Sequence, residues 1–126
     1  LFYVDADEFK RVNDLFGHAV GDVVLATVAE RLGATLRPGD VVGRIGGDEF
    51  AVLCPRLPRS EVGEVERRIL EAASVPIPVA GGHLDISFSI GSAVAVDEAE
   101  LDDLAARADA VMYARKHAGR SAPTGA

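Results

Sequence analysis

The sequence predicts a mixed α/β domain, built on a ferredoxin-like sheet of βαββαβ order with helices packed on it. Apolar residues alternate with polar ones in some segments and recur every three or four residues in others, which are the periods of strands and helices. A glycine-rich turn also joins two apolar runs, as in a hairpin. With 126 residues and 48% hydrophobic content, the chain is long enough for one domain with a substantial core.

The first half of the chain predicts a strand, a helix and a hairpin. The β-prone run Leu1–Val4 is followed by a helix from about Asp22 to Leu36 and by the hairpin strands Val41–Ile45 and Phe50–Cys54. The helix positions expected in the core are Leu25, Val28, Ala29, Leu32 and Leu36. If this helix connects the first strand to Val41–Ile45, those two strands are parallel and the return strand fits between them.

The second half predicts another helix, a strand and a last helix, with a possible minor hairpin between Pro76 and Gly82. Helical spacing follows a possible Ser60 cap, at Val62, Val65, Ile69 and Ala73. Period-two alternation predicts a half-buried strand with Leu84, Ile86, Phe88 and Ile90 on one face. Helical spacing returns at Leu101, Leu104, Ala108 and Met112.

Acidic residues occur where two predicted strands meet the same edge of the sheet. Asp5 follows the first strand, and the pentapeptide Gly46–Phe50 places Asp48 and Glu49 on the hairpin turn. Clustered carboxylates repel one another, and a divalent cation with phosphate oxygens is the usual reason to tolerate them. Oxygen ligands favour Mg²⁺ or Mn²⁺ over zinc. The alternative is that Gly-Gly-Asp is simply good turn chemistry.

The motifs together resemble the GGDEF domain of diguanylate cyclases over nearly the whole chain. The resemblance rests on Asp5, Phe9-Lys10, Asn13-Asp14, Gly17-His18, Gly21-Asp22, Gly46–Phe50, Ser89–Gly91, Asp109–Tyr113, Lys116 and Gly119-Arg120. It implies the ferredoxin-like fold of GGDEF and nucleotidyl cyclase catalytic domains. We expect the domain to span residues 1–120 without the N-terminal segment found in relatives, and a flexible tail at 121–126.

The resemblance also implies roles for individual residues. The implied metal ligands are Asp5, the carbonyl of Ala6, Asp48 and Glu49, with Asp48 as proton acceptor and Glu49 as the second catalytic acid. The implied substrate-binding residues are Asn13 and Asp22 for guanine, His18 in the pocket, the amides near Glu8, Phe9 and Lys10 for phosphate oxygens, and Lys116 and Arg120 for the outer phosphates. His18 could instead be a turn residue. Lys116 and Arg120 could simply form the basic C-terminal end of a helix.

The implied reaction joins two GTP molecules into cyclic di-GMP across an antiparallel homodimer of domains, so a monomer should be inactive. Two alternatives remain open from the sequence. The domain could be a non-catalytic module that binds GTP or cyclic di-GMP, or a nucleotidyl cyclase that makes a cyclic mononucleotide.

A second signature precedes the hairpin. The segment Arg37-Pro38-Gly39-Asp40 resembles the RxxD inhibitory product site of the family, and Arg68 matches a secondary arginine in some relatives. Physically, an arginine can pair with phosphate and an aspartate can accept from guanine. The alternative is an ordinary helix stop made by proline and glycine.

Composition excludes several classes of function. A formal charge of −7 argues against nucleic-acid binding through a broad basic surface. The apolar runs are too short to span a bilayer, so we expect no membrane contact from this segment. The lone Cys54 excludes an internal disulfide and is expected in the core. With a GTP substrate, these features predict a cytoplasmic domain, possibly the cytoplasmic part of a larger sensor protein.

Overall fold

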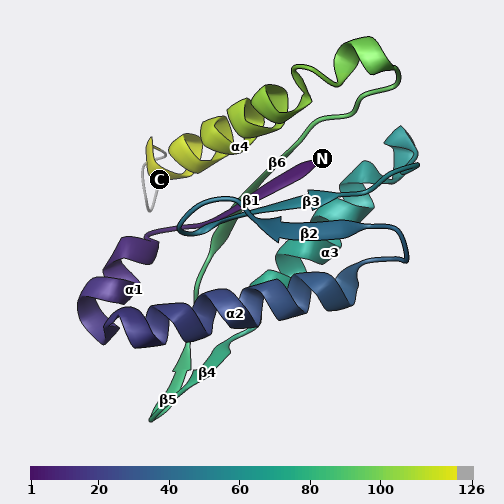
Figure 1. The fold of residues 1–126 in the computed structure, drawn as a ribbon. Coiled ribbons are helices and arrows are strands. Elements are labelled where there is room, and N and C mark those ends of the chain that lie inside the picture. Colours follow the sequence, from purple (N-terminus) through teal and green to yellow (C-terminus); the bar gives the residue numbers. More distant parts are fainter. Residues whose placement is uncertain (122–126) are drawn as a thin grey trace.

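The computed structural model describes residues 1–121, with side chains described through residue 118. Its main sheet has the strands β1 (Phe2–Ala6), β2 (Val41–Arg44), β3 (Glu49–Leu53) and β6 (Phe88–Ser92). The small hairpin pairs β4 (Ile77–Val79) with β5 (Gly82–Leu84). The α-helices are α1 (Phe9–Phe16), α2 (His18–Thr35), α3 (Val62–Ala73) and α4 (Leu104–Ser121), as Figure 1 shows. Short 3-10 helices occur at Arg59–Glu61 and Glu98–Glu100.

The main sheet has the order β2-β3-β1-β6, and each neighbouring pair is antiparallel. Strands β1 and β2 therefore run in the same direction with the hairpin return strand between them, as the βαβ prediction requires. This is the ferredoxin-like order, so the predicted fold is confirmed.

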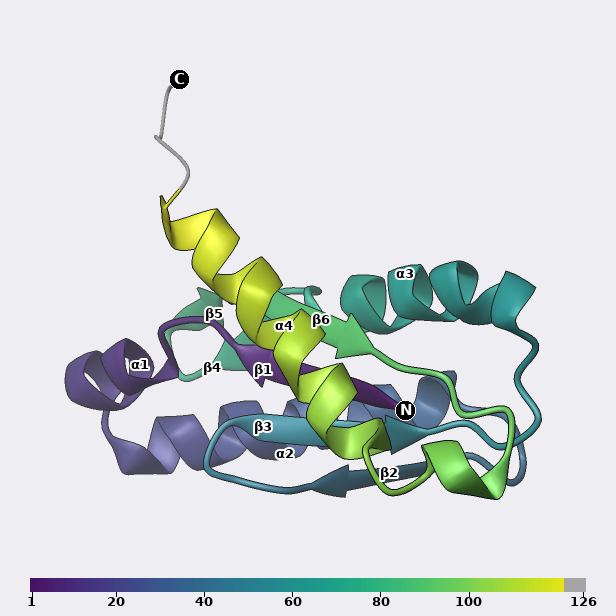
Figure 2. The same cartoon turned by 90° about the horizontal axis from the view of Figure 1, so that it is seen from above.

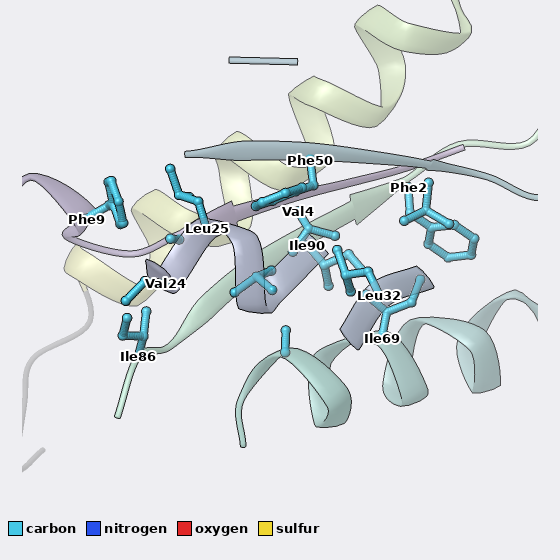
Figure 3. Packing of buried hydrophobic residues seen from close by; sticks show 14 of the residues in the cluster. Phe2, Val4, Phe9, Val24, Leu25, Leu32, Phe50, Ile69, Ile86 and Ile90 are labelled. Atoms are coloured by element: carbon cyan, nitrogen blue, oxygen red, sulfur yellow. The ribbon is translucent and has the colours of Figure 1, made fainter. Parts of the chain in front are cut away.

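Alternation along β1 separates the core from the opposite face of the sheet. Phe2, Val4 and Ala6 are buried and belong to the core cluster that includes residues of α2 and α3. Figure 3 shows their neighbours Leu32, Ile69 and Ile90 converging on the same region. Burying each large apolar side chain contributes about 1.5–3 kcal/mol, so the core holds β1 in one register.

Helix α4 packs on the other face of the sheet, over β1 and β6 (Figure 2). Its residues Leu104 and Ala108 form a second buried cluster, against which Tyr3 of β1 packs. Gly91 of β6 permits the close approach, because a Cβ there would lie 2.5 Å from the Ala108 carbonyl oxygen and 2.6 Å from the Met112 Cα. None of the helices within residues 1–121 is both long and apolar enough to cross a membrane.

The segment after β1 differs from the prediction. It forms helix α1, which the sequence analysis did not identify, and α2 begins at His18 instead of Asp22. Gly17, with φ 89°, turns the chain between them. Glu8 precedes α1 in the left-handed conformation, and no side chain among the described residues caps the helix. The usual sequence signal for a helix start is therefore missing.

Three smaller predictions were wrong. The single strand expected through Leu84–Ile90 is divided, because residues 85–87 leave the ladder between β5 and β6. Helix α3 has Glu61 at its N-cap without a side-chain cap bond, so Ser60 does not cap it. Leu101 lies before α4 and is exposed, whereas Leu104, Ala108 and Met112 are buried as expected. Of the expected tail, 122–126 lies outside the described residues, and the backbone of α4 extends to Ser121.

The close contact at Gly91 generates a prediction for stability. We expect Gly91→Ala to lower the free energy of unfolding by about 2–3 kcal/mol, because α4 must move away from the sheet. Urea denaturation measures this loss. Gly43→Ala is the matched control, since Gly43 lies in a strand of the same sheet and its Cβ would meet nothing within 4 Å. Equal stability of the two variants would contradict the tight packing of α4 on β6.

Candidate active site

The register of β1 brings the predicted acids together. Asp5 lies opposite Glu49 of β3 on one side and Ser89 of β6 on the other. The Ala6 amide donates to the Asp48 carbonyl oxygen at 3.2 Å, so the end of β1 is joined to the β2–β3 turn. The Asp48 carboxylate is close enough to Asp5 that its charge helps to raise the pKa of Asp5, after the larger effect of burial.

The Arg44 side chain forms hydrogen bonds to the backbone of the glycine turn. Its Nε donates to the carbonyl oxygens of Gly46 and Gly47 at 3.1 and 3.2 Å, and a terminal nitrogen donates to Gly47 at 2.8 Å. The Ile45 amide adds a bond to the Glu49 carbonyl oxygen at 2.9 Å. These bonds restrain the turn that presents Asp48, although the Arg44 side chain is itself exposed.

A cleft of about 290 Å³ opens beside this turn. Its lining combines residues predicted from the sequence with Leu25, Arg44 and Gly47; the predicted ones are Phe9, Lys10, Asn13, His18, Asp22 and Asp48. A Cβ at Gly21 would collide with Oδ1 of Asn13, so the glycine leaves the space that the Asn13 side chain occupies. The turn of α1 into α2 thus places an amide and a carboxylate on one wall.

Lys116 of α4 reaches Asp5 on the face of the sheet that α4 covers. Its Nζ lies 2.5 Å from Asp5 Oδ2 and donates to the Ala6 carbonyl oxygen at 3.3 Å. Both side chains are largely buried, with 13% and 14% of their surface exposed. The sequence analysis assigned Lys116 to phosphate, whereas in the structure its ammonium group neutralises Asp5.

Asp7 is a neighbour that sequence reasoning missed. Its carboxylate accepts hydrogen bonds from the hydroxyls of Ser87 at 2.9 Å and Ser89 at 2.7 Å. These bonds join the end of β1 to the start of β6 and keep Asp7 beside Lys116, 3.9 Å from its Nζ. The only available signal was the repeated acid in Asp5-Ala6-Asp7.

The acidic cluster raises the pKa of two carboxyl groups. Burial is the largest cause for Asp5, whose pKa is raised despite the opposing hydrogen bond from Lys116. Burial also raises the pKa of Glu49, and the nearby charges of Asp5, Asp109 and Asp48 act in the same direction. Both groups are therefore harder to ionise than ordinary carboxylates.

The arrangement fits a cation without forming a finished metal cage. Across residues 1–121, no three side chains of His, Cys, Asp or Glu lie together as a ready metal site. Within the same range, however, Asp5 Oδ1 is buried without a hydrogen-bond partner, and the ammonium of Lys116 already contacts Asp5 Oδ2 and the Ala6 carbonyl. These oxygens suit a hard cation such as Mg²⁺.

Phe9, Arg120 and the RxxD loop are the remaining parts of the predicted sites. Phe9 belongs to the buried core and also lines the cleft. The side chain of Arg120 lies outside the part of the chain whose side chains are described. The RxxD loop lies at the opposite end of β2 from the acidic turn (Figure 1).

In the RxxD loop, Asp40 is folded back onto Arg37. Asp40 Oδ2 accepts from the Arg37 amide at 3.0 Å and lies 3.8 Å from its Nε. The Arg37 guanidinium is half exposed, with Glu61 at 4.0 Å. Arg68 approaches from α3 and donates to the Thr35 carbonyl oxygen at 3.5 Å, so all three predicted residues border the end of α2.

A comparison with known families assigns the chain. Residues 1–122 match the family model described as diguanylate cyclase, GGDEF domain. The chain therefore belongs to the GGDEF family.

Individual relatives agree with this assignment. The chain is 35% identical over 122 residues to the bifunctional diguanylate cyclase/cyclic di-GMP phosphodiesterase MucR of Pseudomonas aeruginosa, covering 96% of this chain and 18% of MucR. The GGDEF domain of TpbB (YfiN) from Pseudomonas aeruginosa superposes with a TM-score of 0.86 at 37% identity, over 93% of this chain and 74% of that one. The GGDEF domain of DgcB from Caulobacter crescentus, solved with c-di-GMP, superposes with a TM-score of 0.80 at 31% identity. The match covers 94% of this chain and 71% of that one.

The first curated relatives are much longer than the matched region. The chain spans 18% of MucR and 28% of TpbB from Pseudomonas aeruginosa. The match therefore concerns one domain of such proteins.

The raised pKa of Glu49 generates a prediction for stability against pH. A carboxyl whose pKa is raised by folding favours the folded state below its ordinary pKa and loses that contribution as the pH rises through the raised value. We expect Glu49→Gln to melt at a higher temperature than wild type at pH 7 in EDTA. The gain stays below about 1 kcal/mol, because the group is only partly buried.

The difference should shrink as the pH falls below the ordinary pKa of a glutamate, because Glu49 then becomes uncharged like the glutamine. Glu30→Gln, on the exposed surface of α2, is the control and should leave the melting temperature unchanged at neutral and at acidic pH. A Glu49→Gln protein that is less stable than wild type at pH 7 would contradict the unfavourable ionisation of Glu49.

Proposed function

We propose that this chain is the catalytic domain of a diguanylate cyclase, which condenses two GTP molecules into cyclic di-GMP and pyrophosphate. The observation that carries the proposal is the position of Asp5 opposite Glu49, with Asp48 at the edge of the cleft that also holds Asn13 and Asp22. Acids for phosphoryl transfer and polar groups for a base are thereby adjacent.

The cleft provides groups for each part of GTP. The Asn13 amide and the Asp22 carboxylate bind the guanine edge, because an amide donates and accepts while a carboxylate accepts from the ring N–H groups. His18 lines the same pocket. Phosphate oxygens face the first amides of α1, at Phe9 and Lys10, where no described side chain forms a cap. Lys116 and Arg120 bind the outer phosphates.

The chemical step is an in-line displacement at the α-phosphorus. The 3′ hydroxyl of one GTP forms the new P–O bond, Asp48 accepts its proton, and the bond to pyrophosphate breaks. Asp5, the Ala6 carbonyl, Asp48 and Glu49 would hold Mg²⁺ or Mn²⁺, which when bound neutralises phosphate charge and lowers the pKa of the attacking hydroxyl. The Arg44 bonds keep the turn, and hence Asp48, in place.

Two domains must cooperate in this reaction. Each cleft binds one GTP, so the two substrates meet across an antiparallel homodimer, and a second displacement in the reverse sense closes the ring. A monomer is inactive. Because GTP is the substrate, the domain works in the cytoplasm.

The RxxD loop is the product site. Arg37 pairs with phosphate and Asp40 accepts from guanine, with Arg68 as a further cation. The half-exposed guanidinium of Arg37 is compatible with this role. The solved complex of DgcB with c-di-GMP supports product binding in a related domain. Cyclic di-GMP bound here inhibits the enzyme.

Loss of Asp48 tests the catalytic role. We expect the full-length Asp48→Ala protein to make cyclic di-GMP from GTP and Mg²⁺ at least about 100-fold more slowly, because the proton acceptor and a metal ligand are lost together. Chromatography of the nucleotide products measures the rate. Asp102→Ala, in the exposed turn before α4, is the matched control and should keep wild-type activity.

The same assay separates the alternative functions. GTP or cyclic di-GMP binding without turnover by wild type would identify a non-catalytic regulatory module. A cyclic mononucleotide product would identify a different nucleotidyl cyclase. Either result would reject the diguanylate cyclase assignment.

Loss of Arg37 tests the product site. We expect Arg37→Ala to weaken cyclic di-GMP binding by about 10–100-fold, which is the effect of losing one charge-assisted hydrogen bond. Calorimetric titration measures the affinity, and inhibition should weaken in parallel. Arg67→Ala is the control, because the ion pairs of Arg67 within the described residues are with Glu64 and Glu71 on the surface of α3. Unchanged cyclic di-GMP binding by Arg37→Ala would reject the product site and favour the alternative that the loop only ends the helix.

A further inference from the structure

The contacts of Lys116 coincide with the oxygens proposed for the metal. Its Nζ lies 2.5 Å from Asp5 Oδ2 and donates to the Ala6 carbonyl oxygen at 3.3 Å. A second acid, Asp7, has its Oδ1 3.9 Å from the same Nζ. Lys116 occupies Asp5 Oδ2 and the Ala6 carbonyl oxygen, whereas Asp5 Oδ1 has no partner among the described residues. A divalent ion that bound all three oxygens would compete with the ammonium group, because the two cations repel one another at such short range.

Burial makes this ion pair more than a surface contact. Lys116 and Asp5 are 13% and 14% exposed, so water screens their charges far less than at an exposed pair. Removing one partner would leave a largely buried charge uncompensated. The pair therefore persists until another charged group replaces one of its members.

The position of α4 does not depend on Lys116. Helix α4 packs closely on Gly91, and its neighbouring Arg115 contacts Glu66 of α3 and donates to the Ile90 carbonyl oxygen at 3.1 Å. Arg107 adds bonds to the Val94 and Glu100 carbonyl oxygens. A long, flexible lysine stem on a helix fixed elsewhere can change partners without moving the helix.

We propose that Lys116 is an exchangeable counter-ion that couples metal binding to nucleotide binding. Without ligand it neutralises Asp5 and covers the Ala6 carbonyl. When the metal takes these oxygens, Lys116 is released, and the phosphates of the nucleotide become its new partner. Metal and nucleotide then strengthen each other's binding by the same factor. This inference rests on the proposed function, which supplies the metal ligands and the nucleotide.

Substitution of Lys116 distinguishes two possibilities: the lysine changes partner when metal binds, or it stays in a permanent structural ion pair with Asp5. The test measures Mn²⁺ affinity by electron paramagnetic resonance, with and without a GTP analogue that has a methylene bridge between its α- and β-phosphorus atoms. Without the analogue, we expect the full-length Lys116→Met protein to bind Mn²⁺ about 10-fold more tightly than wild type, because the competing cation is gone. The analogue should raise the affinity of wild type at least about 5-fold more than that of the variant.

Arg67→Met is the control, since it removes one positive charge from the exposed surface of α3 and should bind Mn²⁺ as wild type does. Lys116→Gln repeats the measurement with a polar side chain, and circular dichroism confirms that each protein is folded. A folded Lys116 variant with wild-type Mn²⁺ affinity and the wild-type gain from the analogue would overturn the exchange and leave the proposed function intact. Absence of Mn²⁺ binding by wild type, even with the analogue, would overturn both.

Discussion

The register of β1 between β3 and β6 is the constraint on which the rest of the structure depends. Because side chains alternate along a strand, burying Phe2, Val4 and Ala6 against α2 and α3 directs Asp5 to the opposite face. The same register sets Asp5 opposite Glu49 and joins Ala6 to Asp48. A slip of one residue would put a carboxylate in the core, so core packing also enforces the geometry of the site.

Helix α4 connects stability with the site from the other side of the sheet. Gly91 lets its backbone lie directly on β6, and Leu104 and Ala108 bury its apolar side. The apolar face of α4 thereby covers the sheet, while Lys116 reaches the end of β1. The reach of Lys116 depends on this packing, because a looser contact with β6 would leave the lysine too distant to neutralise Asp5.

Periodicity was sufficient to predict the sheet but not the contacts at its edge. Alternation in β1 and the glycine turn are local signals, and they predicted that Asp5, Asp48 and Glu49 would converge. Helix α1 has no such signal, since Glu8 adopts a left-handed conformation and no described side chain caps the helix. Alternation through Leu84–Ile90 continues across residues that leave the ladder, so it could not reveal the break. The pairing of Lys116 with Asp5 spans 111 residues, and a lysine can serve either a carboxylate or a phosphate.

The acidic cluster lowers folding stability at neutral pH and is therefore best understood through ligand binding. Burial and mutual repulsion raise the pKa of Asp5 and Glu49, so ionising them opposes folding above their ordinary range. The single charge of Lys116 offsets part of this cost, and Asp5 Oδ1 still has no partner among residues 1–121. The hydrophobic core does not require a partly neutralised carboxylate at the end of β1. A cation of higher charge would satisfy it, and this incomplete neutralisation supports the proposed metal site.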